Sequence, residues 1–260
     1  MKKKILIFII TYKASYRLLK VYKSIPFKKL KKYKINVLIS DDESGDDTIK
    51  YAHKISSKSK NIKLNFNKKN LGYGGNIKIC LNYALKKKFD YAVMIHGDNQ
   101  YNPKYIPKMM EIFEKNRLTQ AVTGSRLLKS IKNIRKGGMP IYKLIGNKIL
   151  TKIHNLLLST SFTDVHTGYW AYKVNNFKNK FYLSATDGYN FDQQIRLQHI
   201  YKKLKITEIP INTVYADEKS QLHIKYAIRF FFETIRFFLI KKKIVNHKTV
   251  KYLAKYNLKN

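Results

Sequence analysis

The 260-residue sequence predicts an α/β fold, in which helices cover both faces of a mostly parallel sheet. Two observations support this prediction. Apolar runs of strand length alternate with helical patterns through the first half of the chain, as in consecutive β-α-β units. Polar clusters follow four of these runs, and open α/β sheets bind their ligands at the carboxyl ends of their strands. The length is sufficient for one large domain.

Short apolar runs bounded by polar residues predict five strands in the first half of the chain. The segments between them have helical spacing of apolar residues, and Asp46 or Asp47 is expected to cap the second helix. A Gly-rich turn precedes the third helix. The strands are expected at residues 5–10, 36–40, 62–66, 91–95 and 120–123. The helices are expected at residues 15–24, 46–56, 76–87 and 103–115.

The alternation changes in the second half, where a basic, Gly-containing stretch at residues 132–140 is interpreted as a loop. The remaining pattern predicts helices at 141–158 and 191–203, with strands at 168–173 and 206–211. A Phe-rich amphipathic helix at 222–240 is followed by three Lys. We expect residues 1–221 to form the main domain. Residues 222–260 would add this helix and a basic tail, either as part of the same domain or as a membrane or dimer contact.

The formal net charge of +37 raises the question of an anionic partner. Only seven of the 53 basic residues are Arg, the side chain best suited to base and phosphate recognition, and an A/T-rich coding sequence would produce the same Lys bias. We therefore expect no specific nucleic-acid binding, whereas an anionic membrane surface fits better. The single cysteine, Cys80, excludes an intramolecular disulfide. No apolar run is long enough for a transmembrane helix. A cytoplasmic protein is expected, either free or peripheral on the membrane face.

The strand predicted at 91–95 ends in a cluster of polar side chains, His96 to Gln100. Asp98 and Gln100 offer carboxylate and amide oxygens at positions i and i+2, the ligands that a hard cation such as Mg²⁺ or Mn²⁺ prefers. An exposed polar loop is the alternative for this segment taken alone.

Three other clusters follow predicted strands, and each also has a purely structural explanation. They are Thr11-Tyr12-Lys13, the acidic run 40–48, and the Gly-rich turn 70–76. The acidic run can accept hydrogen bonds from a nucleobase or ribose, or simply form a solvated turn with a helix cap. The glycines at 72, 74 and 75 match neither the Walker pattern nor the Rossmann pattern.

Together the four clusters resemble the motifs of family 2 glycosyltransferases, which have the GT-A fold. They are most similar to the branch that resembles dolichyl-phosphate mannose synthase and bacterial polyprenyl-phosphate glycosyltransferases. The resemblance extends over about residues 4–225 in family order, and the ordered set is more specific than any single motif. The matching segments are 10–12, 41–48, 70–75, 97–103, 123–126, 163–164, 168–169 and 218–220.

The resemblance implies roles for the residues of the first three clusters. Thr11 and Tyr12 would flank the base or ribose, although Ala14 replaces an acidic residue that is usual there. Asp41 or Asp42 would read the base, and Asp41 is preferred. Gly72 and Gly74 would lie near the nucleoside.

The resemblance also implies a divalent cation, Mg²⁺ or Mn²⁺, bound by Asp98 and Gln100. His96 departs from the family pattern, because it stands where the first acid of an Asp-x-Asp motif is expected. Three roles are open for His96: a metal ligand, a hydrogen-bond donor to the diphosphate when protonated, or a packed structural residue.

Phosphate and acceptor contacts follow from the later motifs. Arg126, Arg135 and Lys219 would face the phosphates of the donor. Asp164, His166 and Asp192 would shape the sugar or acceptor pocket. If the acceptor is a hydroxyl, one of these three must remove its proton, and the sequence does not choose among them.

The implied activity is an inverting transfer of sugar from a GDP- or UDP-sugar to a polyprenyl phosphate or similar lipid-linked acceptor. One alternative is transfer to a hydroxyl of a cell-surface polysaccharide or lipopolysaccharide. A second alternative, of another class, is a non-catalytic nucleotide- or polyanion-binding protein on the same fold. The predicted helix at 222–240 would pack on the core, join a homodimer, or lie on an anionic membrane.

Overall fold

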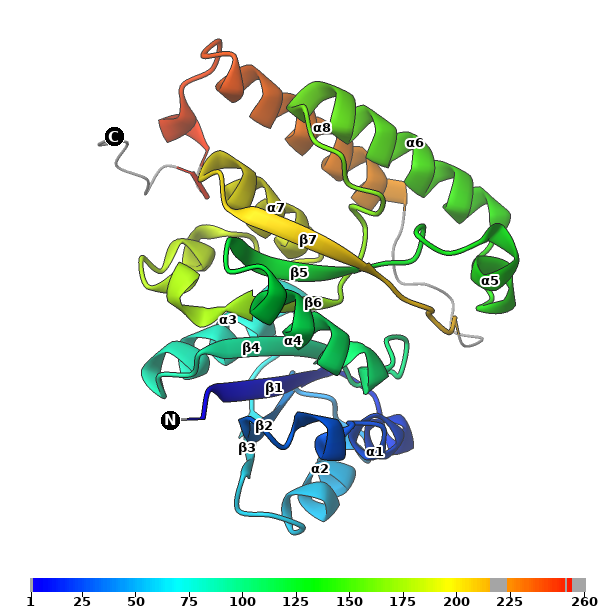
Figure 1. Ribbon diagram of the computed structural model, residues 1–260, viewed down its shortest axis with the longest axis vertical. Coiled ribbons are helices and arrows are strands. Elements are labelled where there is room, and N and C mark those ends of the chain that lie inside the picture. The colour runs from blue at the N-terminus through cyan, green and yellow to red at the C-terminus, as the bar shows by residue number, and fades with distance from the viewer. Residues whose placement is uncertain (1, 216–223, 251, 254–260) are drawn as a thin grey trace.

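The computed structural model describes residues 2–215, 224–250 and 252–253 (Figure 1). Its centre is a seven-stranded sheet with the strand order β3-β2-β1-β4-β6-β5-β7. All neighbouring strands are parallel except β6, which is antiparallel to both β4 and β5. The predicted mostly parallel α/β fold is confirmed. The strands are β1 (Lys4–Thr11), β2 (Lys34–Asp41), β3 (Ile62–Phe66), β4 (Tyr91–His96), β5 (Thr119–Ser125), β6 (Trp170–Lys173) and β7 (Lys205–Pro210).

Helices cover both faces of this sheet. Helices α1, α2 and α4 pack on one face, and α3, α7 and α8 pack on the other. The helices are α1 (Tyr16–Lys23), α2 (Thr48–Ser56), α3 (Tyr73–Lys86), α4 (Ile106–Lys115), α5 (Ile131–Lys136), α6 (Ile141–Leu158), α7 (Phe191–Tyr201) and α8 (Ile224–Lys241). Short 3₁₀ helices occupy Phe27–Leu30, Pro103–Tyr105, Val174–Phe177, Phe181–Ser184 and His247–Thr249.

The continuous apolar sequence of β1 is explained by its place in the middle of the sheet. Successive side chains of a strand point to opposite faces, and both faces of this sheet are covered. Leu6 and Phe8 enter the core beneath α3 and α7, whereas Ile5, Ile7 and Ile9 enter the core beneath α1, α2 and α4. All five side chains are fully buried.

The loop predicted at 132–140 is wrong for residues 132–136, which belong to α5 (Ile131–Lys136), whereas residues 137–140 are non-helical as predicted. The Ser130 hydroxyl accepts a hydrogen bond from the Asn133 N–H and caps this helix. Ile134 is buried in a small separate cluster with Met139 and Leu144. The capping Ser130 and the single buried Ile134 support this short helix, and the basic residues around them obscured this signal.

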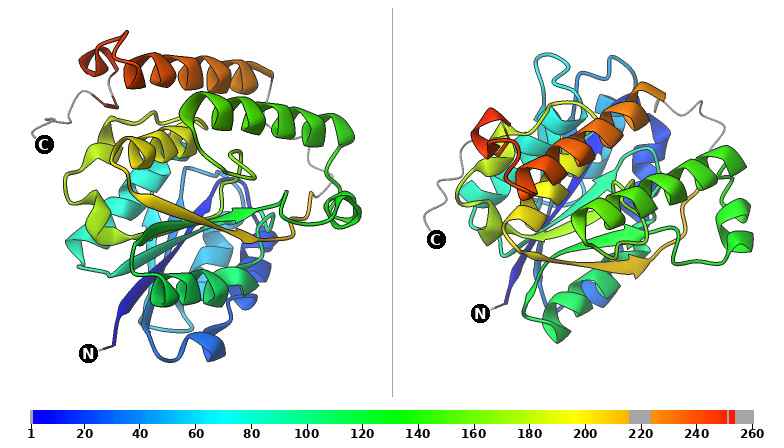
Figure 2. Two further views of the ribbon diagram at one scale, coloured as in Figure 1. Left: turned by 45° about the horizontal axis from the view of Figure 1, so that its top comes forward. Right: turned by 90° about the horizontal axis from the view of Figure 1, so that it is seen from above.

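Helices α6 and α8 lie side by side in an outer layer above α7 (Figure 2). The side chains of α8 that face inward, including Phe230 and Phe237, are buried. The predicted Phe-rich helix therefore packs on the core along one of its sides. Within the described residues, no helix is long and apolar enough to cross a membrane.

Candidate functional site

The carboxyl ends of β1, β2 and β4 bring three of the predicted polar clusters together. In the register of the sheet, Thr11 pairs with Asp41, and Ile10 pairs with His96. The Gly97 N–H donates to the Ile10 carbonyl at 2.9 Å. A Cβ at Gly97 would lie 2.6 Å from Thr11 Cγ2, so the two chain segments can approach this closely only with glycine.

The predicted metal ligands lie in the loop after β4. Asp98 and Gln100 are both half-buried, and Asp98 Oδ1 accepts a hydrogen bond from the Gln100 N–H at 2.8 Å. No group of three or more His, Cys, Asp or Glu side chains suited to a metal ion occurs in the described part of the chain. One carboxylate and one amide still fit Mg²⁺ or Mn²⁺, because such ions commonly take their remaining ligands from substrate phosphates and water.

A chain of hydrogen bonds connects this edge of the sheet to α3 and α7. The Tyr73 hydroxyl, at the start of α3, lies 2.6 Å from Asp192 Oδ2 and 3.2 Å from His96 Nε2. Asp192 is in the first turn of α7. Tyr73 belongs to the predicted Gly-rich turn. Its role could not be predicted from the sequence, because its contact with a residue 119 positions away depends on the packing of two helices.

His96 is half-buried and packs among aromatic rings. Its ring meets that of Tyr101 edge-on, with centroids 5.0 Å apart, and a Cβ at Gly168 would lie 2.8 Å from His96 Cε1. Burial lowers the pKa of His96, although Asp98 opposes this shift. Of the three roles considered for His96, packing is the one that these contacts support, and a protonated donor to a diphosphate is disfavoured.

Asp192 has the most unusual environment of the three carboxyl and imidazole candidates for a general base. It is buried, and Oδ1 has no hydrogen-bond partner among the described residues. Burial raises the pKa of Asp192 to about 7, although the hydrogen bond from Tyr73 opposes this shift. A carboxyl that titrates near neutral pH can exchange a proton with a bound ligand.

The surroundings of the remaining two candidates, Asp164 and His166, lower the pKa of both side chains. Burial is the largest influence on the Asp164 carboxyl and would raise its pKa, but Arg126 outweighs burial and holds the pKa at about 2. Burial lowers the pKa of His166 to about 3. Neither group is a good proton acceptor near neutral pH, which leaves Asp192 as the one of the three with a pKa near neutral.

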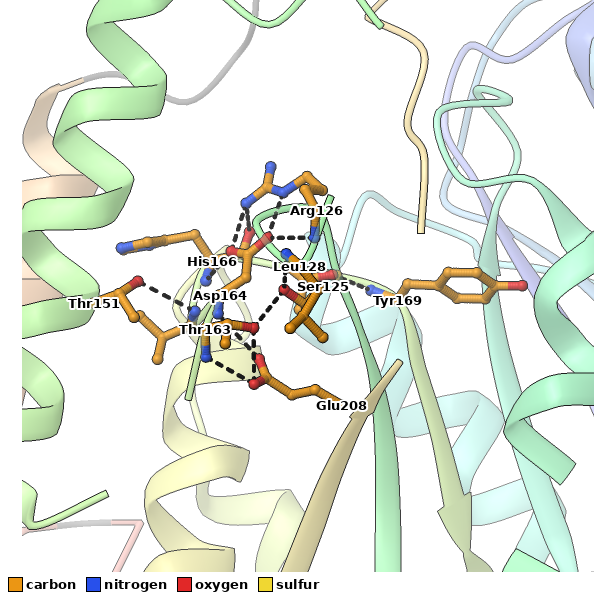
Figure 3. Close-up of polar contacts among 12 residues, drawn as sticks. Ser125, Arg126, Leu128, Thr151, Thr163, Asp164, His166, Tyr169 and Glu208 are labelled. Atoms are coloured by element: carbon orange, nitrogen blue, oxygen red, sulfur yellow. Dashed lines mark hydrogen bonds and ion pairs between the residues drawn. The ribbon is translucent and has the colours of Figure 1, made fainter. Parts of the chain in front are cut away.

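Arg126 was expected to face the open site as a phosphate contact. It instead forms a buried ion pair with Asp164 (Figure 3). Arg126 Nε lies 2.7 Å from Asp164 Oδ2, and Nη2 lies 2.9 Å from Oδ1. Arg126 also donates to the His166 carbonyl and to the Tyr215 hydroxyl. Because its charge is already neutralised, Arg126 joins the end of β5 to the 163–166 segment rather than presenting a bare cation to a diphosphate.

The carboxylate of Glu208, which was not among the predicted site residues, holds the segment that carries Asp164. Glu208, on β7, accepts hydrogen bonds from the N–H groups of Thr163 and Asp164 at 2.7 and 3.0 Å, and from the Thr163 hydroxyl at 2.9 Å (Figure 3). The Ser125 hydroxyl adds a 2.6 Å hydrogen bond to Thr163. The one sequence signal that could have indicated a structural role for Glu208 is the position of an acidic residue within a predicted strand.

The preference for Asp41 as the base-reading residue is not supported by its environment. Asp41 is 1% exposed and accepts hydrogen bonds from the Thr11 hydroxyl at 2.8 Å and from the N–H and hydroxyl of Ser44. Its oxygens therefore stabilise the loop. Asp42 Oδ1 accepts from Asn67 and from the Leu71 N–H, which leaves Oδ2 outside these bonds. Asp42 is also buried, at 4% exposed, but its Oδ2 is not committed to these loop contacts as the oxygens of Asp41 are.

The Gly-rich turn has a packing role that the prediction of a nucleoside contact for Gly72 and Gly74 did not include. The N–H groups of Gly74 and Gly75 donate to the Asp187 carbonyl at 2.6 and 3.2 Å. A Cβ at Gly72 would lie 2.7 Å from that same oxygen. These glycines form the first turn of α3 and its contact with the 186–187 segment, so α3 begins three residues before its predicted start.

We expect Gly74→Ala to destabilise the protein by about 1–3 kcal/mol, because the new methyl group overlaps the Thr186 carbonyl and lies 2.9 Å from Phe191 Cβ. Gly146→Ala, inside α6, is the matched control. Nothing lies within 4 Å of a Cβ there, so Ala should stabilise the helix by about 0.5–1 kcal/mol. Urea unfolding measures both variants. Equal effects of the two substitutions would contradict the packing role.

The other predicted residues are not brought into this network. Tyr12 is exposed, with Lys13 Nζ 5.2 Å from its ring centroid. Arg135 is exposed on α5 and forms no hydrogen bond or ion pair with the other candidates in the described part of the chain. Lys219 lies outside the described residues.

The sequence motifs, now placed at one edge of the sheet, match a known family. A family model described as Glycosyl transferase family 2 matches residues 6–181. The chain belongs to glycosyl transferase family 2. It is 32% identical to the uncharacterized protein MJ0544 of Methanocaldococcus jannaschii over 199 residues, which cover 74% of this chain and 82% of the relative. It is 25% identical to the uncharacterized glycosyltransferase MG060 of Mycoplasma genitalium over 214 residues, 74% of this chain and 70% of that protein.

Solved structures confirm the GT-A fold of this family 2 glycosyltransferase. Glucosyl-3-phosphoglycerate synthase from Mycobacterium tuberculosis in complex with uridine diphosphate aligns with a TM-score of 0.63 and 15% identity, covering 94% of this chain and 82% of that one. The same enzyme in complex with Mn²⁺, UDP-glucose and phosphoglyceric acid aligns with a TM-score of 0.62 and 13% identity, covering 94% and 81%. At this identity the likeness extends to the fold alone.

Proposed function

We propose that this family 2 glycosyltransferase transfers a sugar, with inversion, from a GDP- or UDP-sugar to a polyprenyl phosphate or similar lipid-linked acceptor at the cytoplasmic face of the membrane. The observation that carries the proposal is the attachment of α7, which holds Asp192, to the membrane-suited helix α8. Gln193 Nε2 donates to the Phe230 carbonyl at 2.8 Å and to the Thr234 hydroxyl at 3.1 Å. Such an activity would serve cell envelope biogenesis.

The donor would lie across the carboxyl edge formed by β1, β2 and β4. Asp42 has a carboxylate oxygen left for the base or ribose, and exposed Tyr12 lies beside the same edge. Asp98 and Gln100 would hold a divalent cation at the diphosphate. The solved structures with Mn²⁺ and UDP-glucose on the same fold are consistent with a donor of this class.

The proposed reaction is a single displacement at the anomeric carbon. When bound, the cation would neutralise charge that develops on the departing diphosphate. A phosphate acceptor is already anionic, so it attacks without losing a proton. Asp192 would then contribute as a partly protonated carboxyl, which repels an anionic acceptor less than a full carboxylate would. Arg126 and Asp164 would position the 163–166 segment beside the sugar.

A second candidate reaction, transfer to a sugar hydroxyl, is favoured by one observation. Asp192 is buried, its Oδ1 accepts no hydrogen bond from any residue that the structure describes, and its pKa is about 7, and these are the properties of a general base. A hydroxyl acceptor requires such a base, because the proton must leave as the new bond forms. Glycans of the cell surface are acceptors of this class.

Thermal unfolding with nucleoside diphosphates tests the donor site. We expect GDP or UDP with Mn²⁺ to raise the melting temperature of the wild type, and Asp98→Asn to remove the part of this shift that depends on the metal. The control is Asp90→Asn, an acid at the opposite end of β4 that hydrogen-bonds to Lys3 and Lys4. It should retain the full shift.

Three outcomes of this experiment would change the proposal. No shift with any nucleoside diphosphate or nucleotide sugar would contradict a nucleotide-sugar donor. An unchanged metal-dependent shift in Asp98→Asn would mean that the cation binds elsewhere. Binding without any turnover of a nucleotide sugar, with either class of acceptor, would instead favour a non-catalytic nucleotide-binding protein.

A further inference from the structure

Helix α6 presents a row of large apolar side chains away from the core. Tyr142, Ile145, Ile149 and Leu156 are 72, 52, 54 and 80% exposed. Their spacing of three, four and seven residues places them along one side of the helix. The opposite side of α6 carries Leu158 and other residues that pack inward. The exposed row is therefore not needed for the contact of α6 with the core.

Helix α8 continues this apolar surface. Ile228 and Phe232, one turn apart, are 50 and 62% exposed, whereas Phe230 and Phe237 are buried on the other side of the helix. Helices α6 and α8 pack side by side in the outer layer (Figure 2). In both helices the exposed row lies opposite the buried side, so we infer that the two rows form one outward surface. We call this surface the α6–α8 face: Tyr142, Ile145, Ile149, Leu156, Ile228 and Phe232. Soluble monomers seldom expose so many large apolar side chains together.

The charges around the α6–α8 face are almost all positive. The sequence of α6 contains no acidic residue, and that of α8 contains one, Glu233. The Glu233 carboxylate is occupied by the Tyr252 hydroxyl at 2.7 Å and by Gln194 at 3.2 Å. Lys148, Lys152, Arg229 and Arg236 are exposed on the two helices. In a chain with seven Arg, the placement of two of them here is a notable concentration.

We propose that the α6–α8 face docks on a bilayer that contains anionic lipids. Exposed aliphatic and aromatic side chains would enter the boundary between headgroups and acyl chains, while the Lys and Arg side chains contact lipid phosphates. A second copy of this chain fits less well, because two faces of the same positive charge would repel each other. Docking through this face would bring the proposed active site to the membrane. This proposal rests on the proposed function for the identity of the acceptor, a lipid phosphate.

The docked face would lie next to the site rather than far from it. A cavity of about 410 Å³ lies between α8 and the loop that precedes α7. Arg229, Phe232 and Arg236 line it from α8, and Tyr189 and Asn190 line it from the loop. The Tyr189 ring packs on that of Tyr73, the hydrogen-bond partner of Asp192, with centroids 5.6 Å apart. A phosphate headgroup that enters from the bilayer would therefore meet two guanidinium groups on the side of the molecule that carries Asp192.

Vesicle co-sedimentation of the full chain, without donor or acceptor, tests the apolar part of the proposal. The probe is a vesicle of equal parts phosphatidylglycerol and phosphatidylcholine. We expect Ile145→Ser with Phe232→Ser to lower binding about tenfold or more, because two apolar anchors are lost. Leu118→Ser with Ile49→Ser is the matched control, since these side chains are 73 and 38% exposed elsewhere. The control should bind as the wild type does.

Charge reversal separates a docking face from the general attraction of a basic protein to anionic vesicles. We expect Lys148→Glu with Arg229→Glu to lower binding about tenfold or more, and Lys54→Glu with Lys108→Glu, on α2 and α4, to lower it much less. Equal losses for the two pairs would overturn the proposal, as would equal binding to vesicles of pure phosphatidylcholine. Circular dichroism checks that each variant is folded.

Vesicle binding is measured without donor or acceptor, so its result does not depend on whether the protein transfers a sugar. A wild type that binds vesicles through this face but transfers no sugar would leave the docking proposal intact and contradict the proposed function. A different result would assign the face to a second copy of the chain. In that case the wild type would be a dimer in solution, and Ile145→Ser with Phe232→Ser would convert it to a monomer. The wild type and this variant would also bind vesicles equally well.

Discussion

Replacing Asp192 by Asn is expected to leave transfer to a lipid phosphate within about tenfold of the wild-type rate, but to slow transfer to a sugar hydroxyl about 100- to 10,000-fold. Asn resembles the protonated carboxyl in shape and cannot accept a proton. A phosphate acceptor has no proton to lose, whereas a hydroxyl acceptor must lose one. Steady-state rates with each acceptor class, and a donor chosen by thermal shift, measure the difference.

The pH dependence of stability provides an independent check on the Asp192 assignment. The pKa of Asp192 is raised to about 7 in the folded protein, against about 3.9 in an unfolded chain. The folded state therefore binds this proton more tightly, and the corresponding stability is lost as the pH rises from about 4 through about 7. Asp192→Asn should lack this loss. Parallel stability curves for the variant and the wild type would mean that the carboxyl is not desolvated as described.

Replacing Asp164 by Ala is expected to lower the free energy of unfolding by about 3–5 kcal/mol. Arg126 is 6% exposed, and without Asp164 its charge would remain buried with no carboxylate. Urea unfolding at neutral pH measures the loss. The contribution of Asp164 is present above about pH 4 and is lost as the pH falls toward its folded pKa of about 2.

Two comparisons separate this ion pair from a general effect of losing a carboxylate. Glu111→Ala removes an acid from the exposed pair with Lys115 and should leave the unfolding curve unchanged. Arg126→Met with Asp164→Asn removes both charges and should recover part of the stability lost in Asp164→Ala, since no uncompensated charge is left. If the double variant is the least stable of the three, the penalty does not come from a buried unpaired charge.

The strands of this fold were predictable because a buried parallel strand is a nearly continuous apolar run. Residues 62–66 and the helix at 141–158 have the predicted bounds, and β4 differs from its prediction by one residue. β4 carries this signal because both faces of the sheet exclude polar side chains at its position, whereas the edge strand β3 is indicated by alternating apolar and polar residues. The edge where the polar clusters meet follows from the parallel order of β1, β2 and β4.

The partners of the site residues could not be predicted in the same way. Arg126 and Asp164 are 38 positions apart, and nothing in either local pattern indicates that each neutralises the other. Tyr73 meets Asp192 only because α3 and α7 pack together. The glycines beside Tyr73 suggested a ligand, but their close approach is to the 186–187 backbone. Residue types indicated where polar groups gather, and tertiary packing decided what each one contacts.

The antiparallel strand β6 has a consequence for the order in which this protein can be assembled during synthesis. β4 and β5 do not pair with each other, because β6 lies between them. A nascent chain that ends before Trp170 therefore has an unpaired edge at β4, and its β5 lacks both of its neighbours, β6 and β7, a state prone to pairing with other chains. The 163–168 segment, which carries Asp164 and His166, is the last to be made before the gap is filled. The sheet is complete only after β7 (Lys205–Pro210), whose Glu208 accepts hydrogen bonds from the Thr163 and Asp164 N–H groups. The 163–166 segment and the complete sheet should thus acquire their final contacts together, late in synthesis.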